Sequence, residues 1–126
     1  MLQKLLWIAV AGGMGALARY GLSGLVQRTT NGEFPWGTFV VNVTGCLVFG
    51  MLSAIAESRL SISGETRTII LVGFMGSFTT FSTFAFETSE MLRVSQWLAA
   101  AGNVAGHNIA GIIALLLGLY VGGKLV

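Results

Sequence analysis

One short stretch of this chain, Gly73 to Glu87, places hydroxyl side chains and phenylalanines next to one another. Hydroxyls can donate hydrogen bonds to an anion, and the edge of an aromatic ring carries partial positive charge. Helical spacing puts Phe81 and Phe84 on one face and a track of hydroxyls on the adjoining face. A phenylalanine stripe alone is typical of core packing, but beside this track an anion passage is an equally good interpretation. Thr79, Ser82, Thr83 and Phe86 follow the i, i+3, i+4, i+7 pattern and share the face of this track, with Glu87 one turn beyond Thr83.

The same stretch predicts an interrupted helix. Its glycines and hydroxyls make it too polar for a plain lipid-facing helix, although the residues around it are apolar. In hydrocarbon a backbone break is tolerated only where protein or water satisfies the freed groups. Free carbonyls at such a break favour a cation, and free amide N–H groups favour an anion. We therefore expect a discontinuous membrane helix, broken near Gly76 to Thr80, that lines a site at membrane depth.

Two earlier segments carry polar residues inside apolar runs. Thr38 and Asn42 lie four residues apart, on one helix face, and could donate together into one polar passage. Asn42 could instead join two helices by a hydrogen bond, and Gly45 permits close packing. Arg19 ends the first apolar run, either as an interfacial arginine or as a fixed charge at a vestibule or against the protein interior.

The last apolar run contains Asn103, His107 and Asn108. We interpret His107 as a hydrogen-bonded histidine, because the chain has no second histidine to share a metal. Asn108 fits a helix contact and a pore lining equally well. Gly102-x-x-x-Gly106 is a motif that often marks close helix packing.

Composition places the chain in the membrane class. It has 126 residues, of which 54% are apolar and 10% charged, with one proline. We expect one all-α transmembrane domain over residues 1–126. A spanning helix needs about 20 apolar residues. Four segments satisfy this, at about 5–26, 36–56, 68–91 and 97–121.

Several function classes find no support in the sequence. It contains no nucleophile–base pair, metal cluster or phosphate-binding loop, so we expect no enzyme. It also lacks the basic stripe of a nucleic-acid binder. The expected surroundings are membrane lipid.

The lysines and arginines are distributed almost evenly between the two sides of the membrane. With four spans, one side receives Lys4, Arg59, Arg67 and Lys124, and the other receives Arg28 and Arg93, with Arg19 near that boundary. This is a weak bias under the positive-inside rule, so the chain could insert in both orientations. Four short helices do not easily enclose a pore alone. Both observations favour an antiparallel, dual-topology homodimer.

Three motifs give the chain a clear resemblance. They read Gly12-Gly-Met-Gly-Ala-Leu-Ala-Arg19, Pro35-Trp-Gly-Thr-Phe-Val-Val-Asn42-Val-Thr-Gly45 and Gly73-Phe-Met-Gly76-Ser-Phe-Thr-Thr-Phe-Ser-Thr-Phe84. Together they resemble the CrcB/Fluc fluoride channels over the whole length and the four-helix layout. The third motif is the specific one. Ser77 stands where the family usually has a second glycine, and the last helix matches poorly.

The resemblance implies an antiparallel dual-topology homodimer in a bacterial cytoplasmic (inner) membrane. Its two pores would export cytoplasmic fluoride passively and so lower fluoride toxicity. It also implies a structural sodium ion on the dimer axis, held by the backbone carbonyls of Gly76 and Thr79. The pore residues that it implies are Phe81 and Phe84 as lining rings, Asn42 as the amide donor, Ser82, Thr83 and Thr38 as hydroxyls, Arg19 at the end of the first helix and Glu87 near the far end of the track.

Two alternatives remain at this point. A proton-coupled small multidrug transporter is also a four-helix, dual-topology dimer, but it needs a carboxylate deep in the first helix. The first apolar run here contains no acidic residue. A non-transporting assembly subunit could use the glycine faces to bind a partner, but it would leave the pattern of Asn42, hydroxyls and phenylalanines unexplained.

Overall fold

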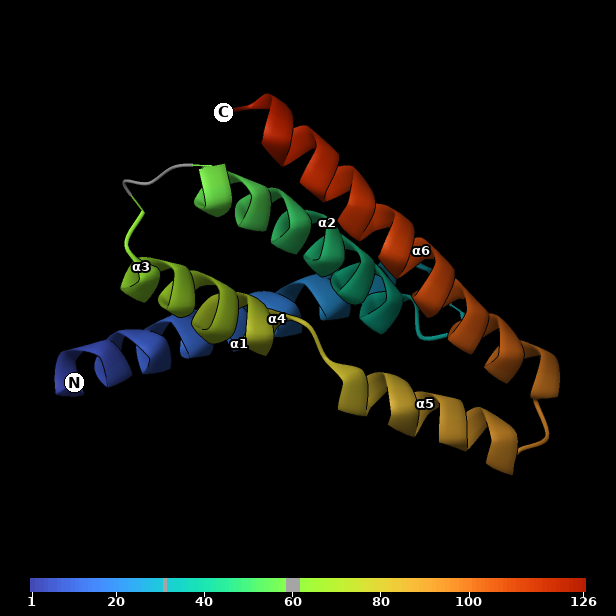
Figure 1. The fold of residues 1–126 in the computed structure, drawn as a ribbon. Coiled ribbons are helices and arrows are strands. Elements are labelled where there is room, and N and C mark those ends of the chain that lie inside the picture. The colour runs from blue at the N-terminus through green and yellow to red at the C-terminus, as the bar shows by residue number, and fades with distance from the viewer. Residues whose placement is uncertain (31, 59–61) are drawn as a thin grey trace.

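The computed structural model describes residues 1–30, 32–58 and 62–126. Every regular element in these ranges is a helix, and four helical spans are long and apolar enough to cross a membrane. The third span, Gly64–Arg93, is a composite of four shorter elements (Figure 1). The predicted all-helical class with four possible spans is therefore confirmed for the described residues. In chain order the elements are α1 (Leu2–Thr30), α2 (Trp36–Ser58), α3 (Gly64–Thr68), η1 (Ile69–Met75), α4 (Gly76–Phe78), α5 (Phe81–Arg93) and α6 (Trp97–Lys124).

The first and last helices extend beyond their apolar runs. The sequence predicts an end near Val26 for the first span, but α1 continues to Thr30. The hydroxyls of Thr29 and Thr30 both donate to the Val26 carbonyl, at 2.9 and 3.0 Å. These bonds give the Val26 carbonyl, in the last turns of the helix, hydrogen-bond donors. Polar residues can therefore continue the helix beyond the apolar run. Likewise α6 ends at Lys124, whose cation suits a helix C-terminus.

Successive spans alternate in direction, and α2 and α6 form the closest pair (Figure 1). Three glycines make this approach possible. A side-chain carbon at Gly50 would overlap the Leu115 carbonyl of α6. One at Gly118 or Gly122 would overlap a backbone carbonyl of α2. By contrast, none of the described residues lies within 4 Å of a side-chain carbon built on Gly102, so among them the predicted close contact does not form at that position.

The first half of the third span packs against α1. A side-chain carbon at Gly15 would overlap the Phe74 carbonyl, and one at Gly73 would lie 3.0 Å from the Ala11 side chain. Small residues thus bring the two backbones together, as expected for helix pairs in membranes. This contact fixes the segment that leads into the interruption.

The third span is interrupted at Thr79 and Thr80. Both residues have extended backbones, with φ/ψ of −83°/157° and −147°/111°. A new helix, α5, then begins at Phe81, and the Thr80 hydroxyl caps it by accepting from Thr83 N. Figure 1 shows this extended link between α4 and α5. Immediately before it, η1 is a π-helix, in which the Gly76 N–H donates to the Leu71 carbonyl five residues back.

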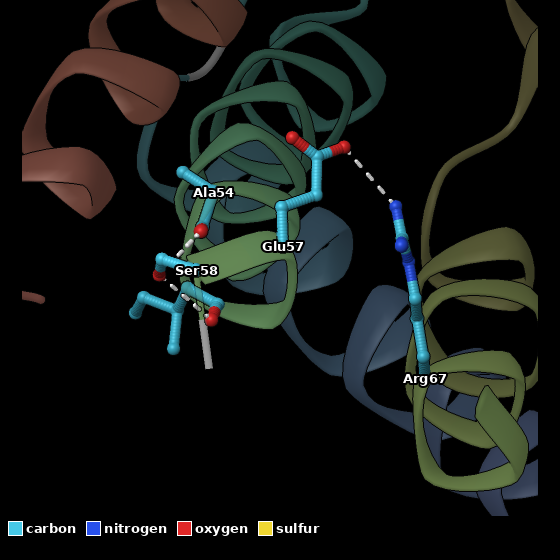
Figure 2. A network of polar contacts seen from close by, with 5 residues as sticks. Ala54, Glu57, Ser58 and Arg67 are labelled. Carbon is cyan, nitrogen blue, oxygen red and sulfur yellow. Dashed lines mark hydrogen bonds and ion pairs between the residues drawn. The ribbon is translucent and has the colours of Figure 1, made fainter. Parts of the chain in front are cut away.

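Side chains also fasten the connections between spans. At the end of α2, Glu57 forms an ion pair with Arg67 of α3 at 3.2 Å, and the Ser58 hydroxyl bonds back to Ala54 (Figure 2). Before α2, the Gln27 side chain donates to two loop carbonyls and accepts from Gly37 N. Arg59, which the charge count assigns to one side of the membrane, lies outside the described residues.

Most large apolar side chains face outward. Val41 and Met75 are buried, but leucines, isoleucines and valines of all four spans are exposed. A water-soluble monomer rarely exposes so much contiguous apolar surface. The chain therefore has the surface of a multi-pass membrane protein.

Candidate functional site

Asn42 of α2 pairs with the interrupted backbone. Its Nδ2 donates to the Thr80 carbonyl at 3.0 Å, and the Thr80 N–H donates to Asn42 Oδ1 at 2.8 Å. The side chain thus replaces the backbone partners that Thr80 loses by leaving the helix. A carboxamide carries two donor hydrogens, so the second Nδ2 hydrogen stays available.

Arg19 of α1 approaches the same interruption. Its Nε donates to the Ser77 carbonyl at 3.1 Å. Carbonyls at a helix C-terminus carry partial negative charge, which a guanidinium stabilises. Of the interpretations left open by the sequence, the structure supports a charge held against the protein interior.

Two carbonyls at the interruption lose their usual helical donors. In a continuous helix the Thr80 N–H would bond to Gly76 and the Thr83 N–H to Thr79. Here Thr80 N donates to Asn42, and Thr83 N donates to the Thr80 hydroxyl at 3.2 Å. Such oxygens are the ligands that hard cations prefer. The described residues contain no cluster of three histidine, cysteine or acidic side chains able to bind a metal.

A cavity of about 300 Å³ opens beside the interruption. Thr79, whose methyl group would overlap a side-chain carbon at Gly45, forms part of its wall. Gly45 therefore makes the close packing that the sequence predicts, and it does so against the break itself. The cavity brings together residues of three spans, including Asn42, Cys46, Thr80, Phe81, Phe84, His107 and Asn108.

The two predicted pore phenylalanines differ in exposure. Phe84 is 9% exposed and Phe81 is 77% exposed, although their ring centroids are only 5.5 Å apart. Phe84 is thus fixed within the chain, whereas Phe81 presents its ring to whatever lies against this side of α5. Both rings line the cavity, as their shared helical face predicts.

The hydroxyl track continues from the cavity along α5. Thr80 Oγ1 donates to Thr83 Oγ1 at 2.9 Å and lies 3.4 Å from Ser82 Oγ. Because Thr83 accepts in this bond, its own hydroxyl hydrogen can serve another acceptor. Of the predicted hydroxyls, those of Ser82 and Thr83 therefore lie together beside Thr80.

Thr38 and Glu87 meet beyond the track. The Thr38 hydroxyl donates to Glu87 Oε1 at 2.6 Å, so Glu87 accepts from a nearby hydroxyl, one of the options that the sequence leaves open. Glu87 Oε2 is buried without a partner among the described residues. Glu87 also lines a separate cavity with Glu33 and Glu90, and neither it nor Thr38 reaches the cavity at the break.

Sequence reasoning missed the contacts of the last helix with this site. The His107 ring lies 4.5 Å from the Phe84 ring, and His107 Nδ1 bonds to the Asn103 carbonyl at 3.0 Å. Asn103 in turn donates to Thr88 of α5 at 2.9 Å. The i, i+4 spacing of Asn103 and His107 was a visible signal that they share a face, but nothing in the sequence identifies Phe84 as their neighbour.

Four apolar spans, with a cavity that Asn42, Thr79 and Thr80 border at an interrupted helix, define a multi-pass membrane protein with the features of an ion pathway. The chain belongs to the CrcB-like family, because the protein-family model described as "CrcB-like protein, Camphor Resistance (CrcB)" matches residues 6–119. The resemblance drawn from the three motifs is therefore confirmed.

Three curated relatives of the chain carry the name "Fluoride-specific ion channel FluC". One from Nitrosococcus oceani is 58% identical, over 96% of this chain and 97% of the relative. One from Nitratidesulfovibrio vulgaris (strain Miyazaki F) is 50% identical, over 96% and 98%. One from Chloroflexus aurantiacus is 36% identical, over 96% of each chain. These are names of channels and not of enzymes, in agreement with the absence of a catalytic constellation in the sequence.

Proposed function

We propose that the chain is a fluoride-selective channel that lets cytoplasmic fluoride leave the cell passively. The observation that carries this proposal is the cavity in which Asn42, Phe81 and Phe84 meet beside the helix interruption. The names of the relatives supply the identity of the ion. The donors of the site supply the chemistry.

Fluoride is small and strongly hydrated, so a pore must replace its water with other donors and still bind weakly enough to release it. The free Nδ2 hydrogen of Asn42, the hydroxyls of Ser82 and Thr83 and the edges of the two phenylalanine rings are such donors. None of them carries a permanent positive charge, which favours exchange over trapping. Thr38 would act on the ion only through Glu87, because the Thr38 hydroxyl hydrogen already bonds to the Glu87 carboxyl group.

The working unit that we propose is an antiparallel, dual-topology homodimer with two pores. Phe81 supports this assignment, because a pore-lining ring that is 77% exposed needs a surface against it. Lipid cannot supply donors to an ion, whereas a second copy can. The proposed location is a bacterial cytoplasmic membrane, with the interruption near the middle of the bilayer. The inside-negative potential then drives an anion outward, at about 2.3 kcal/mol per 100 mV.

A structural sodium ion is a further part of the proposal. The carbonyls of Gly76 and Thr79 fit this role, because the hydrogen bonds of Asn42 and Thr80 remove their helical donors. Bound sodium would supply positive charge against the partial negative ends of the half-helices. Arg19 would act beside the ion, because its guanidinium donates to the neighbouring Ser77 carbonyl and stabilises the partial negative charge there.

The test is fluoride efflux from liposomes that contain the purified chain, with valinomycin and potassium to carry the balancing charge. We expect rapid fluoride release and little chloride release from matched liposomes. Equal release of both anions would refute selectivity. No release from a folded, homogeneous preparation would refute the channel, and a proton-driven drug-cation assay would then test the transporter alternative.

A further inference from the structure

A closed loop of contacts joins α5 to α6 around Phe84. The Thr88 hydroxyl donates to the Phe84 carbonyl at 2.8 Å, and Asn103 Nδ2 donates to that hydroxyl at 2.9 Å. The Asn103 carbonyl receives His107 Nδ1 at 3.0 Å, and the His107 ring returns to the Phe84 ring at 4.5 Å. The loop therefore holds both the backbone and the ring of one pore-lining residue.

The contacts of His107 show which ring nitrogen carries a hydrogen and what holds the ring in place. A backbone carbonyl only accepts, so the His107 Nδ1 must carry a hydrogen in this contact. Phe39 of α2 also packs against His107, with ring centroids 5.2 Å apart and the two ring planes nearly perpendicular. Phe84 therefore packs against an imidazole that is itself fixed by a hydrogen bond and by a second ring.

Asn103 lowers the stability of the fold if helix packing is its only role. Its side chain is fully buried, with 0% exposure, and its Oδ1 has no partner among the described residues. A buried acceptor without a donor costs free energy, whereas an apolar side chain of similar volume would not. The amide therefore weakens the packing of α6 while it secures the Thr88 hydroxyl.

We propose that Thr88, Asn103 and His107 are positioning residues that orient the Phe84 ring for fluoride passage. This inference rests on the proposed channel function. An aromatic ring offers an anion partial positive charge at its edge and partial negative charge on its face. A ring free to rotate would present its face for part of the time and repel fluoride. Rigid support of the ring thus determines both the rate and the selectivity of passage.

Thr88→Val tests the hydrogen-bonded arm of the loop. Valine keeps the shape of the side chain but removes the donor to Phe84 and the acceptor for Asn103. We expect fluoride efflux to fall about tenfold, the equivalent of one hydrogen bond of about 1.4 kcal/mol, and the fluoride-to-chloride ratio to fall with it. Thr88→Ser should restore both. Ser89→Ala is the matched control, because the Ser89 hydroxyl makes a similar bond to Phe86 on the exposed face and has no part in the loop.

Asn103→Leu separates positioning from stability. We expect slower fluoride efflux but a thermal unfolding midpoint no lower than that of the unmodified chain, because leucine removes an unpaired buried oxygen. The double variant with Thr88→Val should be no slower than the slower single variant, since both act through one loop.

The outcomes distinguish this inference from the channel proposal itself. If the unmodified chain releases fluoride and both variants release it within about twofold of that rate, the positioning role is refuted and the channel stands. A flux loss in Asn103→Leu that merely follows a lower unfolding midpoint also refutes positioning. If the unmodified chain releases no fluoride, both proposals fail.

Discussion

Replacement of Asn42 by aspartate is the sharpest test of the site at the interruption. The change keeps the acceptor for the Thr80 N–H at 2.8 Å but puts an oxygen in place of the donor that stands 3.0 Å from the Thr80 carbonyl. A carbonyl that loses its donor costs about 1–3 kcal/mol, which would be a factor of about five to about 160 if the whole cost fell on the rate. The carboxylate would also repel the permeating anion, so we expect fluoride efflux to fall by about a hundredfold or more.

The assay is valinomycin-driven fluoride efflux, on protein shown by size-exclusion chromatography to keep its oligomeric state. Asn108→Asp is the matched control, because Asn108 lines the same cavity but bonds to Val104 of its own helix and not to Thr80. We expect this control to lose far less flux. Normal flux in Asn42→Asp would refute the role of the amide, and an equal loss in Asn108→Asp would show that added charge alone explains the effect.

Three further predictions concern the two pore rings, the sodium site and the link between α5 and α6. Phe81→Ile and Phe84→Ile should each slow fluoride efflux while the dimer stays intact on size-exclusion chromatography, because isoleucine fills space without an aromatic edge; unchanged flux would exclude these rings from the pore. Prolonged dialysis against sodium-free buffer should inactivate the channel, and readdition of sodium should restore flux, if the carbonyls of Gly76 and Thr79 bind that ion; indifference to sodium would remove it from the site. Ser95→Gly should raise the thermal unfolding midpoint. Ser95, in the link between α5 and α6, has a φ of 61°, and at such a positive φ glycine is favoured over other residues by about 1 kcal/mol. A lower midpoint would contradict that expectation.

The sequence predicted the spans and the position of the interruption because both have local causes. Long apolar runs identify the spans. Glycine and hydroxyl residues are dense between Gly76 and Thr80, and there an interruption of the helix is least unfavourable because the chain can satisfy the freed backbone groups. The extended residues Thr79 and Thr80 lie at the end of that predicted range.

The partners of the polar residues could not be predicted in the same way. Arg19 bonds to a backbone carbonyl, and every residue has one, so no side-chain pattern points to Ser77. Asn42 likewise bonds to the backbone of Thr80. The contact between His107 and Phe84 depends on how α6 is placed against α5, which the poor match of the last helix left open.

The π-helix before the interruption has a consequence for changes in chain length. A π-turn contains one residue more than an α-turn, as the bond from Gly76 N to the Leu71 carbonyl shows. Removal of one residue within Ile69–Met75 could be absorbed by a return to α-helical winding. The same deletion after Thr80 would rotate α5 by about 100° and turn Phe84 away from α6. We therefore expect the chain to tolerate the loss of one residue within Ile69–Met75 far better than the same loss just after Thr80, and natural length variants should concentrate within Ile69–Met75.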